Sequence, residues 1–220
     1  MSSERLSGAP SPPPEGDSPA AEVDLGLVSL VRARGAPLLD ALERHLPGSR
    51  EHAAATASYA FATAVELGND RRSSELIRET AKLHEIGKVY VSATVLARQP
   101  GERTADERVQ LEGHSEAAYR LARGAGIPDK VCGWILHVRE RFDGDGPRGL
   151  AGAEIPLESR IARAACACHR GFSARPETGA ASQRCRDAVG ALRAAAGTEL
   201  DPQVVAALAA ALDRIPLAEA

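Results

Sequence analysis

The sequence predicts an all-α fold, a single compact bundle of about seven to nine helices. Almost no segment alternates between apolar and polar residues with the period of two that marks a strand, whereas apolar residues recur at helical spacing along most of the chain. The composition agrees with this prediction. Alanine, the residue with the highest helix propensity, is abundant, and aromatic residues make up only 3% of the chain.

The composition changes after the first 22 residues, and this change predicts the domain organisation. Residues 1–22 are rich in Ser, Pro and Gly and contain too few apolar residues to form a packed core. We therefore expect a disordered tail at residues 1–22, followed by one helical domain over residues 23–215.

The first helices of the domain are predicted from their end signals. A helical pattern begins at Val23, and Pro37 fits the first turn of a second helix that ends near His45. Ser49 is then expected to cap a long alanine-rich helix that reaches about Glu66 and stops at Gly68.

The later helices are predicted in the same way. Ser73 or Ser74 is expected to cap the next helix. Thr104 opens a helix over residues 104–123, because Glu107 three positions later completes a capping box. Pro128 begins another helix. The remaining helices are expected at residues 157–170, 181–196 and 202–213.

Charge and hydropathy exclude several classes of function. The net charge of −3 gives no reason to expect binding to duplex nucleic acid or to an acidic membrane. No apolar run approaches the 18 residues or so that a membrane-spanning helix needs, and the N-terminus lacks the apolar region of a secretory signal. We therefore expect a cytoplasmic protein in which the four cysteines are buried or half-buried thiols.

Four histidines, each on a separate predicted helix or its end, are the strongest functional pattern. They are His52, His84, His114 and His137. One such histidine is most often an ordinary surface or core residue. One ligand from each of several helices is nevertheless how a helical bundle builds a metal site, and imidazole with carboxylate suits Fe, Mn or Zn.

Several separated segments resemble one family. "LHEIGKV" at residues 83–89 is followed in order by "GHSEAAYRLA", "ILHVRERFDGDGPRGLAGAEIPLESRIARAACA" and "GTELDPQVVAAL". In these segments the chain resembles the HD-GYP branch of the HD metal-dependent phosphohydrolases over residues 49–213. The resemblance implies an all-α domain with a centre of two or three metal ions that hydrolyses cyclic di-GMP, a bacterial second messenger.

The same resemblance assigns roles to residues of this chain. It implies that His52, His84, Glu85 and His114 are metal ligands, with Glu85 in the place of the family's aspartate and also a catalytic residue. It implies that Lys88 contacts the phosphate and stabilises charge in the transition state.

Other family positions differ, and the differences predict a degenerate site. Val138 and Arg139 stand where the family has two adjacent histidines, and His137 is one residue early, which turns its side chain by about 100° on a helix. Cys166 replaces the last family aspartate, and its thiolate would change the metal preference. We expect at most one divalent ion (Fe, Mn or Zn), at a single residual site.

The long loop between Phe142 and Ile155 adds a further candidate. It carries "GDGPRG" in place of the Gly-Tyr-Pro signature, and Arg148 within it is a candidate for contacting phosphate or a guanine. Asp143 and Asp145 in the same loop suggest calcium, but the rest of an EF-hand loop is missing, so we interpret them as turn residues.

The sequence leaves two main functions open. The first is a weak metal-dependent phosphodiesterase acting on a cyclic dinucleotide. The second is a non-catalytic signalling domain that keeps the helical fold and binds a nucleotide or a protein partner. A phosphohydrolase acting on a different nucleotide is a weaker third hypothesis, because the sequence does not supply the additional ligands it would need.

Overall fold

The computed structural model confirms the all-α prediction for the residues it describes, 20–173 and 181–214. Most of the predicted tail, residues 1–19, lies outside this range. The described residues form no β-strand, and their helices are α1 (Ala20–His45), α2 (Ser49–Glu66), α3 (Arg71–Leu83), α4 (Ala93–Ala97), α5 (Ala105–Glu112), α6 (His114–Gly124), α7 (Asp129–His137), α8 (Leu157–Ser173), α9 (Ala181–Ala194) and α10 (Pro202–Asp213). Three short 3₁₀-helices, η1 (Ile86–Tyr90), η2 (Pro100–Glu102) and η3 (Gly152–Glu154), lie between them.

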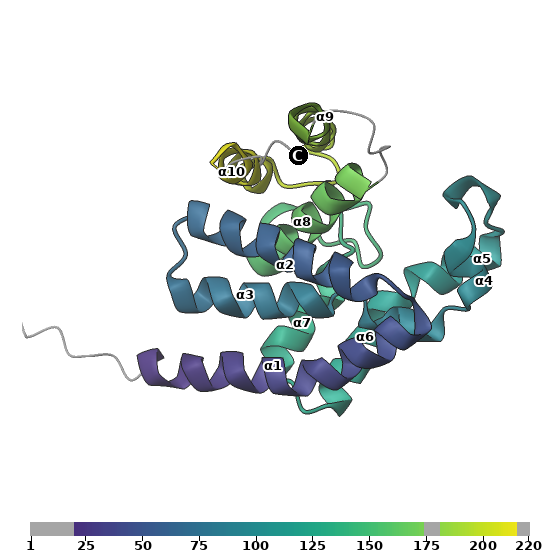
Figure 1. Ribbon diagram of the computed structural model, residues 1–220, viewed down its shortest axis with the longest axis horizontal. Helices are drawn as coiled ribbons and strands as arrows, with labels where there is room; N and C mark the ends of the chain where they lie inside the picture. Colours follow the sequence, from purple (N-terminus) through teal and green to yellow (C-terminus); the bar gives the residue numbers. More distant parts are fainter. Residues whose placement is uncertain (1–19, 174–180, 215–220) are drawn as a thin grey trace, which may run out of the picture.

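Several helix boundaries differ from the prediction. Pro37 does not begin a second helix but lies inside α1, which turns in direction over its second half (Figure 1). The cap of α3 is Asp70 rather than Ser73 or Ser74, because its carboxylate accepts hydrogen bonds from the backbone N–H groups of Arg72 and Ser73. The cap of α2 is Gly48, in the left-handed conformation, so that Ser49 is the first helical residue.

The predicted helix at residues 104–123 is two helices. The capping box of Thr104 and Glu107 is present as expected and begins α5. At Gly113 the helix breaks, and His114 begins α6. The sequence prediction missed this break because helical periodicity continues through Gly113, where the backbone ψ of −7° is about 35° from the helical value.

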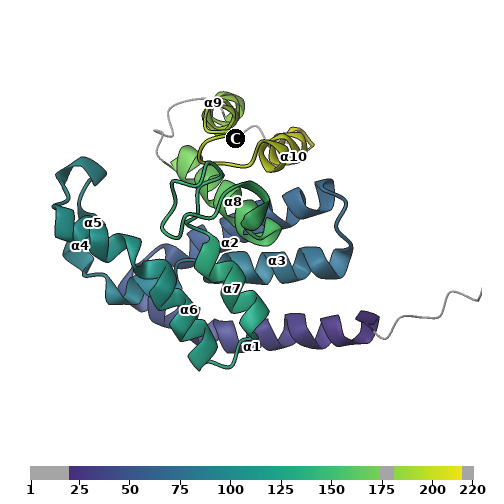
Figure 2. The ribbon, with the colours of Figure 1, turned by 180° about the vertical axis from the view of Figure 1, so that it is seen from behind.

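The helices stack so that α3 and α2 lie between α1 on one side and the α9–α10 pair on the other (Figure 1). Helix α8 packs across α2, α9 and α10, and α7 lies against α3 and α6 on the reverse side (Figure 2). No helix among the described residues has both the length and the apolar character needed to cross a bilayer.

Two clusters of buried apolar side chains form the core, and α3 contributes to both. Ile77 and Ala81 pack with residues of α2, α8, α9 and α10. Leu76 and Leu83 pack with residues of α1, η1, α6 and α7. The end of α3 therefore lies at the junction of the two clusters, and the chain that follows it, "HEIGK", is held from both sides.

Gly87 makes the close packing after α3 feasible. A Cβ atom at this position would lie 1.9 Å from the carbonyl oxygen of His114 and 2.5 Å from the backbone nitrogen of Ala118. Only glycine therefore lets η1 lie directly against α6. This contact brings the histidine at the end of α3 and the histidine at the start of α6 to the same part of the molecule.

Candidate metal centre

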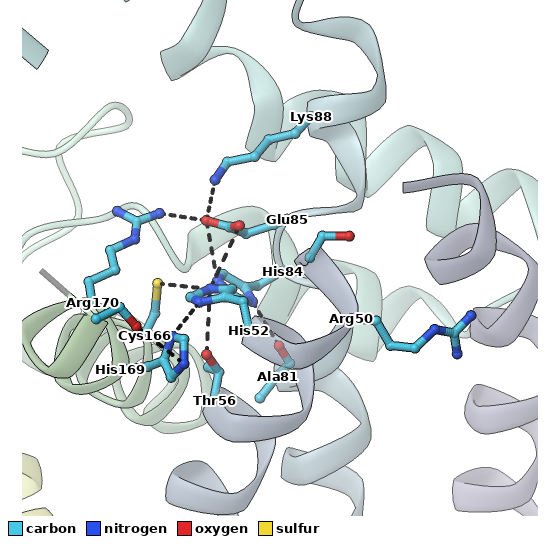
Figure 3. A network of polar contacts seen from close by, with 12 residues as sticks. Arg50, His52, Thr56, Ala81, His84, Glu85, Lys88, Cys166, His169 and Arg170 are labelled. Carbon is cyan, nitrogen blue, oxygen red and sulfur yellow. Dashed lines mark hydrogen bonds and ion pairs between the residues drawn. The ribbon is translucent and has the colours of Figure 1, made fainter. Parts of the chain in front are cut away.

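Four side chains from three segments bring potential ligand atoms together, all within 4.8 Å of one another. They are His52 on α2, His84 and Glu85 after α3, and Cys166 on α8 (Figure 3). We call these four residues the ligand cluster. His84, Glu85 and Cys166 are buried, and His52 is partly buried.

Glu85 reaches both histidines despite having one methylene more than an aspartate. Its Oε2 lies 3.7 Å from Nε2 of His52, and its Oε1 lies 3.8 Å from Nε2 of His84. Sγ of Cys166 lies 3.7 Å from the same Nε2 of His52. Atoms that share a tetrahedral ion at ordinary bond lengths are about 3.4 Å apart, so these separations fit one ion after small adjustments.

The hydrogen bonds of the two histidines leave their ligand atoms available. Nδ1–H of His84 donates to the carbonyl oxygen of Ala81 at 2.7 Å, so Nε2 carries the lone pair. This Nε2 is buried and has no hydrogen-bond partner. Nδ1 of His52 lies 2.8 Å from Nδ1 of His169, which orients Nε2 of His52 toward Glu85 and Cys166. A buried imidazole nitrogen that carries a lone pair and has no hydrogen-bond partner is available to bind a metal ion.

Burial keeps the histidines neutral, which is the form that binds metal. It lowers the pKa of His52 to about 4, of His84 to about 3 and of His114 to about 4. Burial also raises the pKa of the Cys166 thiol, so a metal ion would have to displace its proton. Two nitrogens, one carboxylate and one sulfur suit Zn²⁺ or Fe²⁺ better than Mg²⁺.

Glu85 carries the negative charge of the cluster. Burial raises its pKa, but His84, Lys88 and Arg170 outweigh this effect and hold it well below the ordinary value. Nζ of Lys88 and Nη2 of Arg170 both lie 2.5 Å from the Oε1 atom of Glu85 (Figure 3). Two cations therefore share one carboxylate oxygen, while Oε2 remains directed toward His52.

A cavity of about 340 Å³ opens beside the cluster, and three of the residues that form its wall are arginines. We call Arg139, Arg163 and Arg170 in this wall the arginine wall. Arg163 is paired with Glu199, and Arg170 with Glu85. Arg139 makes no side-chain hydrogen bond or ion pair with any described residue, and its Nε is buried without a partner. Burial and the nearby Arg170 lower its pKa.

The structure brings some predicted site residues to the cluster and leaves others outside it. His114 lines the same cavity and donates from Nδ1 to the carbonyl oxygen of Leu111, but it is not among the four clustered ligands. Lys88 lines a neighbouring cavity and reaches the cluster only through Glu85. Arg148 pairs with Glu116 on α6 and does not line the cavity of the cluster.

Neither Val138 nor His137 supplies a ligand to the cluster. Val138 is part of the apolar core with 4% of its surface exposed. His137 faces Glu140, at 4.0 Å, rather than the cluster. In the loop after α7, Asp143 pairs with Arg141 and accepts the backbone N–H of Asp145, so both aspartates serve the turn.

Sequence reasoning missed the contributions of His169 and Arg170. His169 is partly exposed, four residues before the end of α8, and its Nδ1 lies 2.8 Å from Nδ1 of His52. A signal was available, because His169 and Arg170 follow Cys166 by three and four residues and so share its helical face.

Comparisons with known proteins agree with this fold. A family model described as "HD domain" matches residues 37–204. The chain is 35% identical over 148 residues to the cyclic di-GMP phosphodiesterase response regulator RpfG of Xanthomonas campestris, which covers 66% of this chain and 38% of that protein. It is 34% identical over 134 residues to 3'3'-cGAMP-specific phosphodiesterase 1 of Vibrio cholerae, covering 60% of this chain and 31% of that protein. The chain therefore spans less than half the length of these relatives.

Solved structures of the same kind share the fold. Bd1817, an HDG"Y"P protein from Bdellovibrio bacteriovorus, has a TM-score of 0.63 at 17% identity, covering 88% of this chain and 63% of that one. The HD domain of the phosphodiesterase PgpH from L. monocytogenes, in complex with cyclic-di-AMP, has a TM-score of 0.59 at 17% identity. The match covers 80% of this chain and 95% of that one. At this identity the likeness concerns the fold.

Proposed function

This chain belongs to the HD-domain family, and from that premise we propose that it binds one divalent metal ion at the ligand cluster and hydrolyses slowly a phosphodiester of the cyclic dinucleotide class. The observation that carries the proposal is the set of four ligand atoms within 4.8 Å beside a cavity with an arginine-rich wall. The names of the relatives, which are phosphodiesterases of cyclic di-GMP and of 3'3'-cGAMP, support this substrate class.

The residues that would hold the ion are His52, His84, Glu85 and Cys166, because their donor atoms converge and Nε2 of His84 has no other partner. A divalent ion held there would need a coordination position beyond these four ligands to bind a water and lower its pKa, and it would also neutralise phosphate charge. Only one such group of ligands is found among the described residues, and Val138 supplies none. We therefore propose slow rather than efficient hydrolysis, since a two-metal clamp on both attacking and leaving oxygens would be missing.

The protein's own cations would bind and orient the anionic substrate. Arg139 has no carboxylate partner, so its guanidinium is free to donate two parallel hydrogen bonds to phosphate oxygens. Arg170 lines the same cavity, and Lys88 contacts Glu85 from the neighbouring cavity. Nε2 of His114 can only accept a hydrogen bond, because its Nδ1–H is used by Leu111, so it would bind a hydroxyl or a water rather than a phosphate oxygen. Arg139 and Arg170 would fix the phosphodiester beside the cluster.

A second function, nucleotide binding without hydrolysis, is favoured by one observation. Glu85 is already neutralised by Lys88 and Arg170, so the cavity carries positive charge even without an ion. A site of this kind can hold a phosphate with no metal. In this function nucleotide binding itself would be the signal, and a protein partner would have to recognise the nucleotide-bound form.

Metal analysis combined with a turnover assay separates the two functions. We expect about one metal ion per chain, and slow conversion of cyclic di-GMP in the presence of Mn²⁺, Fe²⁺ or Zn²⁺. His84→Ala should lose both the ion and the turnover, whereas Arg148→Ala, outside the cavity, should keep the ion. Protein without metal that binds cyclic di-GMP but never converts it would contradict the enzymatic function and support the second one.

A further inference from the structure

A second cavity adjoins the first, beneath a projecting part of the chain. Helices α4 and α5 extend away from the helical body in both ribbon views (Figures 1 and 2), and we call residues 91–112, which contain them, the arm. None of the residues of α5 is buried. The arm is held together largely by its own hydrogen bonds, such as those from the Arg103 guanidinium to the carbonyl oxygens of Val95 and Arg98.

The cavity between the arm and the body has a volume of about 300 Å³. The arm contributes Leu96, Arg103 and Leu111 to its lining. The body contributes three cations, Lys88, Arg139 and Arg170, together with His114 and Leu46. Four positive side chains therefore line this space, and no carboxylate is among the described residues that line it.

These four cations are not equally neutralised. Lys88 and Arg170 share the single charge of Glu85. Arg103 donates only to backbone carbonyl oxygens, and Arg139 has no partner among the described side chains. Like charges gathered in a partly buried space repel one another, so the arrangement is favourable only when an anion enters.

The two cavities share three residues, His114, Arg139 and Arg170. Arg139 therefore stands between the space beside the ligand cluster and the space beneath the arm. A ligand with two anionic groups could place one group in each, with Arg139 between them.

We propose that the cavity beneath the arm is a second anion subsite, in which Arg103 and Arg139 bind a second phosphate group of the ligand. The leucines of the arm provide apolar contact for the sugar or base that joins the two phosphates. The subsite selects ligands with two separated phosphates over those with one. The assignment of the first phosphate to the ligand cluster rests on the proposed function, but the second subsite needs no metal ion.

The test compares variants of Arg103 in equilibrium binding of three probes to the full chain, with and without chelator. The probes are cyclic di-GMP, which has two phosphates, cyclic GMP, which has one, and inorganic pyrophosphate. We expect Arg103→Gln to weaken cyclic di-GMP binding by about 10-fold, the effect of one lost charge-assisted hydrogen bond, and cyclic GMP binding by less than about 2-fold.

Two further variants separate charge from structure. Arg103→Lys should recover most of the lost affinity, because it keeps the charge while losing the guanidinium bonds to Val95 and Arg98. Arg98→Gln removes one charge from the same arm, where Arg98 pairs with Glu107 outside the cavity, and should leave all affinities unchanged. Equal losses in Arg103→Gln and Arg103→Lys would overturn the charge role.

The possible results also distinguish this proposal from the proposed function. Cyclic di-GMP binding that is equal in Arg103→Gln and Arg98→Gln would overturn the subsite and leave the proposed function standing. Pyrophosphate binding that needs Arg103, with no binding of cyclic di-GMP, would support the subsite and contradict the proposed substrate class. Wild-type protein that binds neither cyclic di-GMP nor pyrophosphate would overturn both the subsite and the proposed function.

Discussion

The ligand cluster and the arginine wall lie around the same cavity, yet they differ in whether buried charges have an opposite charge beside them. In the cluster, burial keeps the histidines neutral, and the one carboxylate, Glu85, is paired with two cations. In the wall, Arg139 is partly buried, and its side chain forms no ion pair with any residue that the structure describes. The charge of Glu85 is thus compensated within the folded chain, whereas Arg139, unlike Arg163 and Arg170, forms no ion pair there. The comparison indicates that the cluster can take up a cation without a further charge change in its carboxylate, and that Arg139 is available to an anion.

The largest expected effect is the loss of folding stability at low pH. In the metal-free protein the folded pKa values of His52, His84 and His114, about 4, 3 and 4, lie below the unfolded value near 6.5. Between these values the unfolded chain binds more protons, so stability is fully present above about pH 6.5 and is lost as pH falls toward 4. We expect urea denaturation to show a loss of about 3 kcal/mol for each of the three histidines between pH 7 and pH 4, or about 9 kcal/mol in all. A flat profile, or one that His84→Asn does not flatten, would contradict the neutral state of the cluster.

The next effect tests the pairing of Glu85. Glu85→Ala leaves Lys88 and Arg170 without their shared counter-charge, and we expect a loss of about 3 kcal/mol in the free energy of unfolding at pH 7. Glu116→Ala is the matched control, because Glu116 pairs with Arg120 and Arg148 at the surface, where we expect less than about 1 kcal/mol. Equal losses in the two variants would show that the cluster gains nothing from this pairing.

The metal preference of the cluster depends on its sulfur. Cys166→Ser replaces a soft ligand with a hard one, and we expect the affinity for Zn²⁺ to fall by about 100-fold while that for Mn²⁺ changes by less than about 3-fold. Cys132→Ser serves as the control, because this buried thiol bonds to Ile127 away from the cluster. Calorimetric titration measures both affinities. An unchanged Zn²⁺ affinity would exclude Cys166 as a ligand.

A smaller effect tests the orientation of His52. His169→Phe keeps a ring of similar shape but removes the nitrogen that bonds Nδ1 of His52, and we expect metal affinity to fall by about 10-fold. His169→Gln retains an acceptor and should restore part of the affinity. The same titration decides the matter, and a Phe variant that binds metal as tightly as the wild type would show that His169 does not position its neighbour.

The smallest expected effect is that of Arg139, in the arginine wall, on the free energy of unfolding. Arg139→Met removes a buried, unpaired cation, so we expect the free energy of unfolding to stay unchanged or to rise by up to about 1 kcal/mol. Arg163→Met removes a cation that is paired with Glu199, and it should lower that free energy by about 1 kcal/mol. If both variants lost the same stability in urea denaturation, Arg139 would have a partner within the fold.

The helices themselves were largely predictable because their signals are local. The capping box of Thr104, the extent of the alanine-rich α2 and the start of α7 after Pro128 all follow from contacts within a few residues. Predictions failed where a competing local arrangement won. Asp70 rather than a serine caps α3, and Pro37 is tolerated inside α1.

The sequence by itself determined the all-α class, the candidates His52, His84 and Glu85, and the replacement of two family ligands by Val138 and Cys166, because residue type and spacing carry this information. Only the tertiary structure decided which of these side chains meet. Packing of α8 across α2 brings Cys166, His169 and Arg170 to the end of α3. Gly87 lets η1 lie against the start of α6, where His114 is the first residue. Such contacts join positions up to 117 residues apart, and no local pattern of residues encodes that proximity.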